Sequence, residues 1–325
     1  MPLTPMTADD NVRMTDPLSL AGVASLDHLG VLRAHGADAA VFLQGQLTND
    51  VAGLDPSNVR LAGFCSAKGR LQASFIVWRR GPEEFLLVCA RDLLAATLKR
   101  LSMFVLRAKC RLSDASGEMT LWGVAGTPAT SMLEGMSPWQ RREIAGGELL
   151  SLPGAAGIAR GLCVAPAGAA LPLPDAPVLA ADAWRWLEVQ SGIVTIEAAT
   201  VDRFVPQMVN FELVGGVDFR KGCFPGQEVV ARSQYRGTAK RRTFLFDCEQ
   251  LPLAGQDVFV RGAEGEAVGT VANAAPHPGA VGGSELIELR LAALSDEGLA
   301  LGAHDGALLH RRALPYDVPL ESAVD

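Results

Sequence analysis

The chain has 325 residues, of which 49% are hydrophobic, so it can bury sizeable cores and is expected to divide into two or three domains. Its formal net charge is -7 and its isoelectric point is near 5.3, which argues against a protein that holds nucleic acid by broad neutralisation of phosphates. We therefore expect no stable direct contact with nucleic acid.

The cysteines and the apolar stretches exclude further classes of protein. Six cysteines are scattered, with no Cys-x-x-Cys pair and no histidine nearby at metal-ligand spacing, so we expect free thiols and no metal site. Residues 1–20 lack a basic start and a continuous apolar segment, which predicts a cytoplasmic protein without a secretory signal. The most apolar stretch, 161–181, contains four prolines and is expected to be a loop rather than a membrane span.

The first half of the chain predicts an α+β unit. After a polar segment over residues 1–22, apolar residues recur at helical spacing from Asp38. Two strands then flank the turn Lys68-Gly69, and a helix over 92–104 packs on the resulting sheet. The strand-like runs are 30–34, 62–70 (a strand that leads into the Lys68-Gly69 turn), 71–78, 85–90, 109–112 and 119–124.

Later segments define the remaining domain boundaries. We divide the chain into the polar segment 1–22, an α+β region 23–240 and a small β-barrel 241–325, because short strands separated by glycines and prolines follow Lys240. A smaller subdomain is expected within the α+β region, at about 116–181.

A helix that starts near Asp182 and is closed by Gly192 carries two tryptophans. Trp184 and Trp186 are two positions apart, so they point to different sides of the helix. One is expected in the core, and the other either stacks on a flat ring or is also buried.

Three polar residues come next in the chain. They either supply hydrogen bonds to a ligand or cap helices and face solvent; they are Gln207, Asn210 and Glu212.

The run from Lys221 to Glu228, Lys-Gly-Cys-Phe-Pro-Gly-Gln-Glu, carries the most plausible reactive chemistry. Its glycines and proline predict a tight connection, and Gln227-Glu228 predict a helix start, so Cys223 would lie just ahead of a helix. The helix dipole and Lys221 would both favour thiolate, whereas the alternative is a small buried cysteine in a turn. The residues predicted to support the thiol and its partner Lys221 are Gly222, Gly226, Gln227, Glu228 and Arg232.

The spacing Lys-Gly-Cys-aromatic-x-Gly-Gln-Glu-x-x-x-Arg, followed by an aromatic, Arg and Gly, resembles the signature of the YgfZ family. The segment from Gly36 to Asp50 resembles the amino-terminal segment that this family shares with the T-protein, the aminomethyltransferase of the glycine-cleavage system. YgfZ proteins bind folate and are linked to the maintenance of iron-sulfur enzymes, including those that modify tRNA.

The resemblance implies an α+β, T-protein-like multi-domain fold around a folate pocket, with tetrahydrofolate or a derivative as cofactor. It favours Trp184 as the residue that stacks on the pterin, and Gln207, Asn210 or Glu212 as the acceptor of pterin hydrogen bonds. Arg236 belongs to a basic cluster with residues 240–242 that is either solvated or receives the polyglutamate tail of folate.

The implied function is that of an accessory factor in the assembly or repair of iron-sulfur enzymes, with iron-sulfur proteins or their assembly factors as partners. Cys223 would then be the reactive or cluster-contacting thiol, and any cluster contact would be shared because clusters normally take four ligands. A third possibility is a binding module that senses folate and docks on a partner.

The alternative is a folate-dependent aminomethyltransferase, and one departure in the sequence speaks against it. In the T-protein, aspartates follow the turn that matches Gly69, and one of them serves methylene transfer. Here residues 69–74 read Gly-Arg-Leu-Gln-Ala-Ser and contain no carboxylate.

Overall fold

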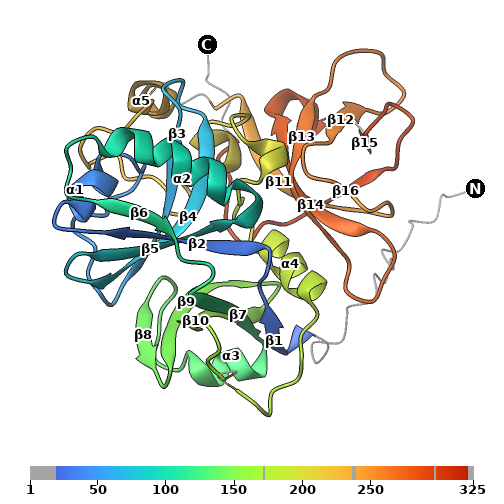
Figure 1. The fold of residues 1–325 in the computed structure, drawn as a ribbon. Coiled ribbons are helices and arrows are strands. Elements are labelled where there is room, and N and C mark those ends of the chain that lie inside the picture. The colour runs from blue at the N-terminus through green and yellow to red at the C-terminus, as the bar shows by residue number, and fades with distance from the viewer. Residues whose placement is uncertain (1–19, 171–172, 236–238, 296–297, 321–325) are drawn as a thin grey trace, which may run out of the picture.

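The computed structural model describes residues 20–170, 173–235, 239–295 and 298–320, and it arranges them in three antiparallel sheets joined by helices (Figure 1). The polar segment predicted over 1–22 lies almost wholly outside the described residues. Within the described ranges, no helix combines the length and the apolar character needed to cross a membrane.

The first sheet has strand order β3-β4-β5-β2-β6 and forms the α+β unit predicted for the first half of the chain. Helix α1 (Ala39–Gln44) buries Phe42 and Leu43, and helix α2 (Arg91–Val105) buries Leu94 and Leu101, as the helical spacing of their apolar residues predicts. The strands are β2 (Leu29–His35), β3 (Val59–Cys65), β4 (Leu71–Gly81), β5 (Glu84–Ala90) and β6 (Arg111–Asp114).

The second sheet has strand order β1-β7-β10-β9-β8 and is flanked by helix α3 (Thr127–Met132). It combines four strands from the expected subdomain with β1, which comes from the start of the described chain. The strands are β1 (Gly22–Ser25), β7 (Met119–Ala125), β8 (Arg141–Ile144), β9 (Gly147–Ala155) and β10 (Ile158–Pro166).

The third sheet has strand order β15-β12-β13-β14-β11-β16 and curls into a nearly closed barrel, as predicted for the last part of the chain. A single bridge between Ala300 and Leu308 brings its two ends together. The short helix η4 (Leu291–Ser295) follows β14. The strands are β11 (Arg241–Cys248), β12 (Asp257–Val260), β13 (Gly269–Pro276), β14 (Gly283–Arg290), β15 (Leu299–Leu301) and β16 (Leu309–Arg312).

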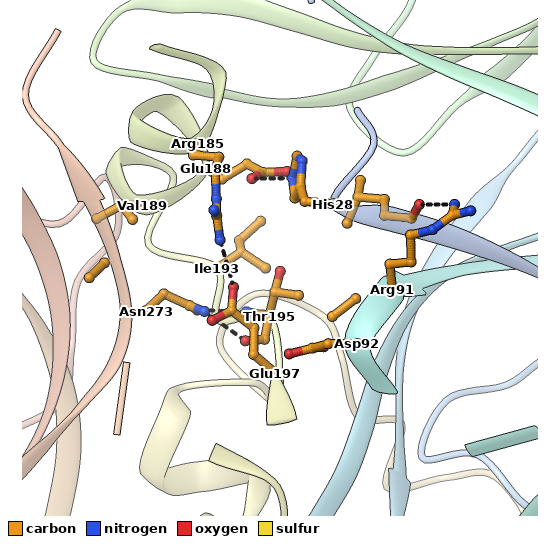
Figure 2. Close-up of a pocket in the computed structure, with 13 residues that line it drawn as sticks. His28, Arg91, Asp92, Arg185, Glu188, Val189, Ile193, Thr195, Glu197 and Asn273 are labelled. Carbon is orange, nitrogen blue, oxygen red and sulfur yellow. Dashed lines mark hydrogen bonds and ion pairs between the residues drawn. The ribbon is translucent and has the colours of Figure 1, made fainter. Parts of the chain in front are cut away.

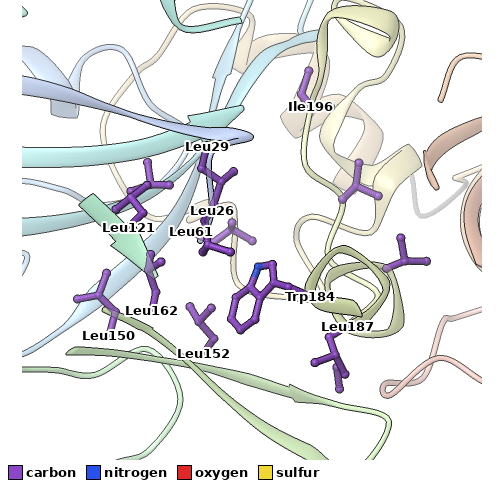
Figure 3. Packing of buried hydrophobic residues seen from close by; sticks show 14 of the residues in the cluster. Leu26, Leu29, Leu61, Leu121, Leu150, Leu152, Leu162, Trp184, Leu187 and Ile196 are labelled. Atoms are coloured by element: carbon purple, nitrogen blue, oxygen red, sulfur yellow. The ribbon is translucent and has the colours of Figure 1, made fainter. Parts of the chain in front are cut away.

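Helix α4 (Ala181–Gln190) lies where the three sheets meet. Trp184 points toward the second sheet, where Gly123 makes room for it: a Cβ atom at Gly123 would lie 2.4 Å from the indole ring. Trp186 points the other way and donates from Nε1 to Ser284 Oγ in the barrel, at 3.0 Å. Figure 3 shows Trp184 among leucines of the first and second sheets. One apolar core therefore joins these two sheets through α4.

The barrel encloses a carboxyl group that has no partner. Glu285 lies two and four residues before Ile287 and Leu289 on β14, so it points to the same face as these residues of the barrel core. Its side chain is fully buried, and neither carboxyl oxygen has a hydrogen-bond partner among the described residues. Burial and the nearby Asp247 raise its pKa to about 9. The protein therefore folds with Glu285 protonated at neutral pH.

We expect Glu285→Gln to stabilise the fold increasingly as the pH rises from 5 to 8. The pKa of Glu285 is raised on folding, so the unfolded chain binds fewer protons between the unfolded and folded pKa values, and the wild-type free energy of unfolding falls with pH. The neutral amide removes this loss, with a difference on the order of 2 kcal/mol between pH 5 and pH 7. Urea unfolding at several pH values measures it; a pH-independent difference would contradict the assignment.

Candidate functional site

A cavity of about 280 Å³ lies between the first sheet, helix α4 and the barrel. Strand β2, the start of α2, helix α4, the segment after α4 and strand β13 all contribute to its walls (Figure 2). Its polar and charged lining residues are His28, Arg91, Asp92, Arg185, Glu188, Thr195, Glu197 and Asn273. We call this space the central cavity.

Two carboxylates in the central cavity are held by specific partners. Glu188 accepts from Trp184 Nε1 at 2.9 Å through one oxygen and contacts Nε2 of His28 at 3.0 Å through the other. Glu197 forms an ion pair with Arg185 at 3.5 Å, seen in Figure 2, and burial raises the pKa of Glu197 despite this partner. The carboxylates are thus fixed in orientation and partly shielded from water.

The backbone that lines the central cavity is also fixed. The side chain of Asn273 in β13 accepts from the amide of Thr195 and donates to its carbonyl, both at 2.8 Å. Asp92, at the first turn of α2, accepts from the amide of Ala198 at 3.0 Å. These bonds attach the segment after α4 to both the barrel and the first sheet.

A smaller and mostly apolar recess of about 60 Å³ shares Leu29, Glu188, Ile193 and Thr195 with the central cavity. Its wall includes Trp139, which has a positive φ of 65°, a conformation that costs a non-glycine residue roughly 1–3 kcal/mol. Trp139 and Leu61 also line a third, open cavity of about 560 Å³, together with Asp218 and Arg220. Trp139 therefore forms a wall between the buried recess and this outer opening.

The predicted motif follows Arg220 in the chain and packs against the end of helix α1. Lys221 Nζ donates to the carbonyls of Gln44 and of Leu47, the latter at 2.6 Å, and it lies 5.1 Å from the centre of the Phe224 ring. Burial lowers the pKa of Lys221 to about 8, although Asp50, Asp218 and Cys223 act in the opposite direction. Lys221 thus caps the end of α1, which the sequence alone did not indicate.

Cys223 is the exposed member of the six cysteines. Helix α5 (Gln227–Tyr235) begins at Gln227, four residues after the thiol, where the sequence predicts the helix start. Burial raises the pKa of Cys65, Cys89 and Cys163 to about 12, which leaves their sulfurs as neutral, inert thiols. Cys223 is therefore the thiol that a reagent or a partner can reach.

Gly226 fixes the motif on the turn between β3 and β4. Its φ is 76°, and a Cβ atom there would lie 2.4 Å from the carbonyl oxygen of Ser66 and 2.5 Å from the amide of Gly69. Gly69 has a φ of 71° and faces Val229 of α5 in the same way. The supporting residues Glu228 and Arg232 are exposed on α5, and Gly222 is exposed beside the thiol.

The residues predicted to bind pterin lie elsewhere in the molecule. Trp184 is 1% exposed and is not part of the lining of either central space, so it occupies the core position that the sequence left open as an alternative. Gln207 donates to the carbonyl of Val230 in α5 at 2.8 Å, and Asn210 donates to that of Thr243 in the barrel at 2.7 Å. Glu212 pairs with the buried Arg242.

Those three polar residues thus connect the motif helix to the barrel, and the geometry gives them a structural role. Arg241 and Arg242 of the basic cluster are likewise engaged, since Arg241 pairs with Glu288 at 2.7 Å and Arg242 with Glu212. Arg236 lies outside the described residues. No group of three or more His, Cys, Asp or Glu side chains in the described ranges is placed to hold a metal ion.

The hairpin that lacks a carboxylate in sequence receives one from another segment. Asp202, in a left-handed conformation with φ of 60°, accepts at 3.0 Å from both Ser66 Oγ and Gln72 Nε2. Its side chain is exposed and does not belong to the lining of the central cavity or the apolar recess. The hairpin around Gly69 thus has a carboxylate beside it, but this carboxylate does not face the central cavity.

The fold is of the glycine-cleavage T-protein type. A model of the GCVT N-terminal domain matches residues 16–147. The crystal structure of the glycine cleavage system aminomethyltransferase T from Bartonella henselae superposes with a TM-score of 0.73, covering 92% of this chain and 88% of that chain at 18% identity.

Relatives in sequence specify the family within this fold. Proteins named tRNA-modifying protein YgfZ are 31% identical over 80% of this chain in Serratia proteamaculans, covering 81% of the relative, and 34% identical over 73% in Edwardsiella ictaluri, covering 74%. The Escherichia coli O157:H7 protein is 30% identical over 76% of this chain and 78% of its own length. The chain belongs to the YgfZ family.

Sequence reasoning missed the lining of the central cavity. His28, Asp92, Glu197 and Asn273 come from four distant segments, none of which forms a motif by itself. Arg185 and Glu188 could have been found, because they lie on the predicted helix at positions between and beyond its two tryptophans.

We expect Gly226→Ala to cost at least about 3 kcal/mol of stability, since strain at positive φ adds to a clash with the backbone of the β3–β4 turn. Gly135→Ala is a matched control: its φ is 74°, but no atom lies within 4 Å of the place that its Cβ would take, so a cost of about 1 kcal/mol is expected from strain alone. Urea unfolding of both variants provides the comparison. Equal costs would show that the motif does not rest on the turn.

Proposed function

We propose that this protein binds tetrahydrofolate or a derivative in the central cavity and acts as an accessory factor in the assembly or repair of iron-sulfur enzymes, including enzymes that modify tRNA. Membership of the YgfZ family, whose relatives are named tRNA-modifying proteins, supports this proposal. The observation that carries it is the pair of oriented carboxylates inside a cavity at the junction of a T-protein-like fold.

The chemistry of the central cavity fits a pterin. The 2-amino and N3 groups of a pterin are donors, and Glu188 and Glu197 offer carboxyl oxygens that can accept from them. Leu29, Val189 and Ile193 supply apolar walls for the ring. Such a combination of apolar walls with a few convergent polar groups is typical of small-molecule sites.

The size and the charge of the site also fit a folate. The central cavity and the apolar recess measure about 280 and 60 Å³ and share part of their lining, near the lower end of the roughly 300–1,000 Å³ usual for ligand sites. Arg91 and Arg185 are cations that can pair with the carboxylates of a glutamate tail. Trp139, in the recess, replaces Trp184 as the aromatic side chain available to contact the ligand.

Cys223 would serve the assembly or repair of iron-sulfur enzymes, the part of the proposed function that involves a partner protein. The thiol is exposed at the motif, outside the lining of the central cavity, so it is free to meet a protein partner while folate is bound. Its single sulfur can supply one ligand to a shared cluster. As a thiolate it can also attack a disulfide of the partner, which forms a mixed disulfide and releases the other partner sulfur as a thiolate. Folate, when bound, would supply one-carbon chemistry to the complex.

We expect Glu197→Gln to weaken tetrahydrofolate binding about 10- to 100-fold in calorimetric titration, because a charge-assisted hydrogen bond is worth roughly 1.5–3 kcal/mol. Trp139→Leu should also weaken binding. Glu212→Gln tests whether the pterin instead binds at segment 207–212. If Glu212→Gln weakens tetrahydrofolate binding and Glu197→Gln does not, the pterin site lies in that segment. Absence of binding to tetrahydrofolate and to its 5-formyl derivative would remove the folate proposal.

We expect Cys223→Ala to abolish complementation of a bacterial strain that lacks its own YgfZ protein, while changing stability by less than about 0.5 kcal/mol because the thiol is exposed. Folate affinity should also be unchanged. Complementation by the variant at wild-type level would instead favour a module that only senses folate. Turnover of tetrahydrofolate with an aminomethyl donor would favour the transferase alternative.

A further inference from the structure

The second half of α2 and the turn after it form a basic segment in an acidic protein. No Asp or Glu occurs between Asp92 and Asp114, although the whole chain has a net charge of -7. Within the described residues, none of the cations of this segment forms an ion pair; they are Lys99, Arg100, Arg107, Lys109 and Arg111. Charges that the fold itself leaves unpaired are available to a partner.

Exposed apolar side chains lie among these cations. Met103 is 58% exposed, Phe104 41% and Leu106 88%. Leu106 has φ 41° and ψ -101°, a strained conformation for a leucine that costs roughly 1–3 kcal/mol and gains no burial in return. Clustered exposure of this kind marks interaction sites rather than ordinary surface.

Helix α1 extends the same surface. The amide of Asp38 donates to the carbonyl of Lys109 at 3.1 Å, and the amide of Lys109 donates to Oδ2 of Asp38 at 2.7 Å. Val41, one turn into α1, is 71% exposed. We define the α1–α2 surface as Val41, Met103, Phe104 and Leu106 with the surrounding cations.

This surface lies at the same end of the molecule as the reactive motif. Helix α1 begins beside Lys109 and ends at the carbonyls bound by Lys221, and six residues of helix span about 9 Å. Phe104 also stacks edge-to-face on Phe64, whose strand bridges to Leu47. Figure 1 shows α1 and the end of α2 together, on the side away from the barrel.

We propose that the α1–α2 surface is a docking site for a partner protein that presents an acidic segment with one or two apolar side chains. The five unpaired cations would pair with carboxylates of the partner. The exposed leucine, methionine and valine would pack against apolar side chains of the partner. Apart from Phe104, whose ring already contacts Phe64, these side chains are aliphatic and do not stack on bases. The negative net charge also opposes a polyanion, so RNA fits less well. A partner bound here would lie next to Cys223.

The test is site-specific photo-crosslinking of the full-length chain in cells, with benzoylphenylalanine at position 106. The control position is Leu253, which is 65% exposed and precedes strand β12 of the barrel. We expect crosslinks at position 106 to a protein whose attached peptide, identified by mass spectrometry, is rich in Asp and Glu. The double change Arg107→Glu and Lys109→Glu should lower the yield about 10-fold and impair complementation.

The matched charge control is Arg261→Glu, an exposed cation at the end of β12 in the barrel, which should change neither the yield nor complementation. Crosslinks to RNA, to a second copy of this chain, or at no higher yield than at position 253 would overturn the docking proposal. Tetrahydrofolate affinity of the doubly reversed variant should equal that of the wild type. If the wild-type chain does not bind tetrahydrofolate, the folate proposal fails, but the crosslinking result still decides the docking proposal.

Discussion

Trp184 fits against strand β7 because position 123 is a glycine, and this contact sets the place of helix α4 between the sheets. The other side of α4 is fixed by the hydrogen bond from Trp186 to Ser284 in the barrel. Glu188 lies one turn after Trp184 and accepts from its Nε1, and Arg185 lies between the two tryptophans. Arg185 and Glu188 therefore point into the central cavity, and the cavity is a product of the packing of α4.

The motif and the cavity depend on different parts of the fold. The cavity is built on α4 and its contacts with all three sheets, whereas the motif rests on α1 through Lys221 and on the β3–β4 turn through Gly226. Gln207 and Asn210 connect the motif helix to the barrel. A substitution can therefore alter the cavity or the motif separately, although the barrel contributes to the support of both.

The sequence was sufficient for most of the fold. Helices α2 and α4 and most strands have strong apolar periodicity, whereas β15 is three residues long and too short to show any. The site was harder to predict. Adjacent residues reveal a motif such as that around Cys223, but the cavity joins His28, Glu197 and Asn273 across the chain, and only the tertiary contacts bring them together.

The burial of the other five cysteines limits what oxidation of Cys223 can lead to. A sulfenic acid is normally resolved by a second thiolate, and burial raises the pKa of Cys65 to about 12 and that of Cys110 to about 11. Neutral buried thiols are poor nucleophiles, so an internal disulfide is disfavoured. Recovery from oxidative damage would thus depend on a thiol from outside the chain, such as glutathione or a cysteine of the partner.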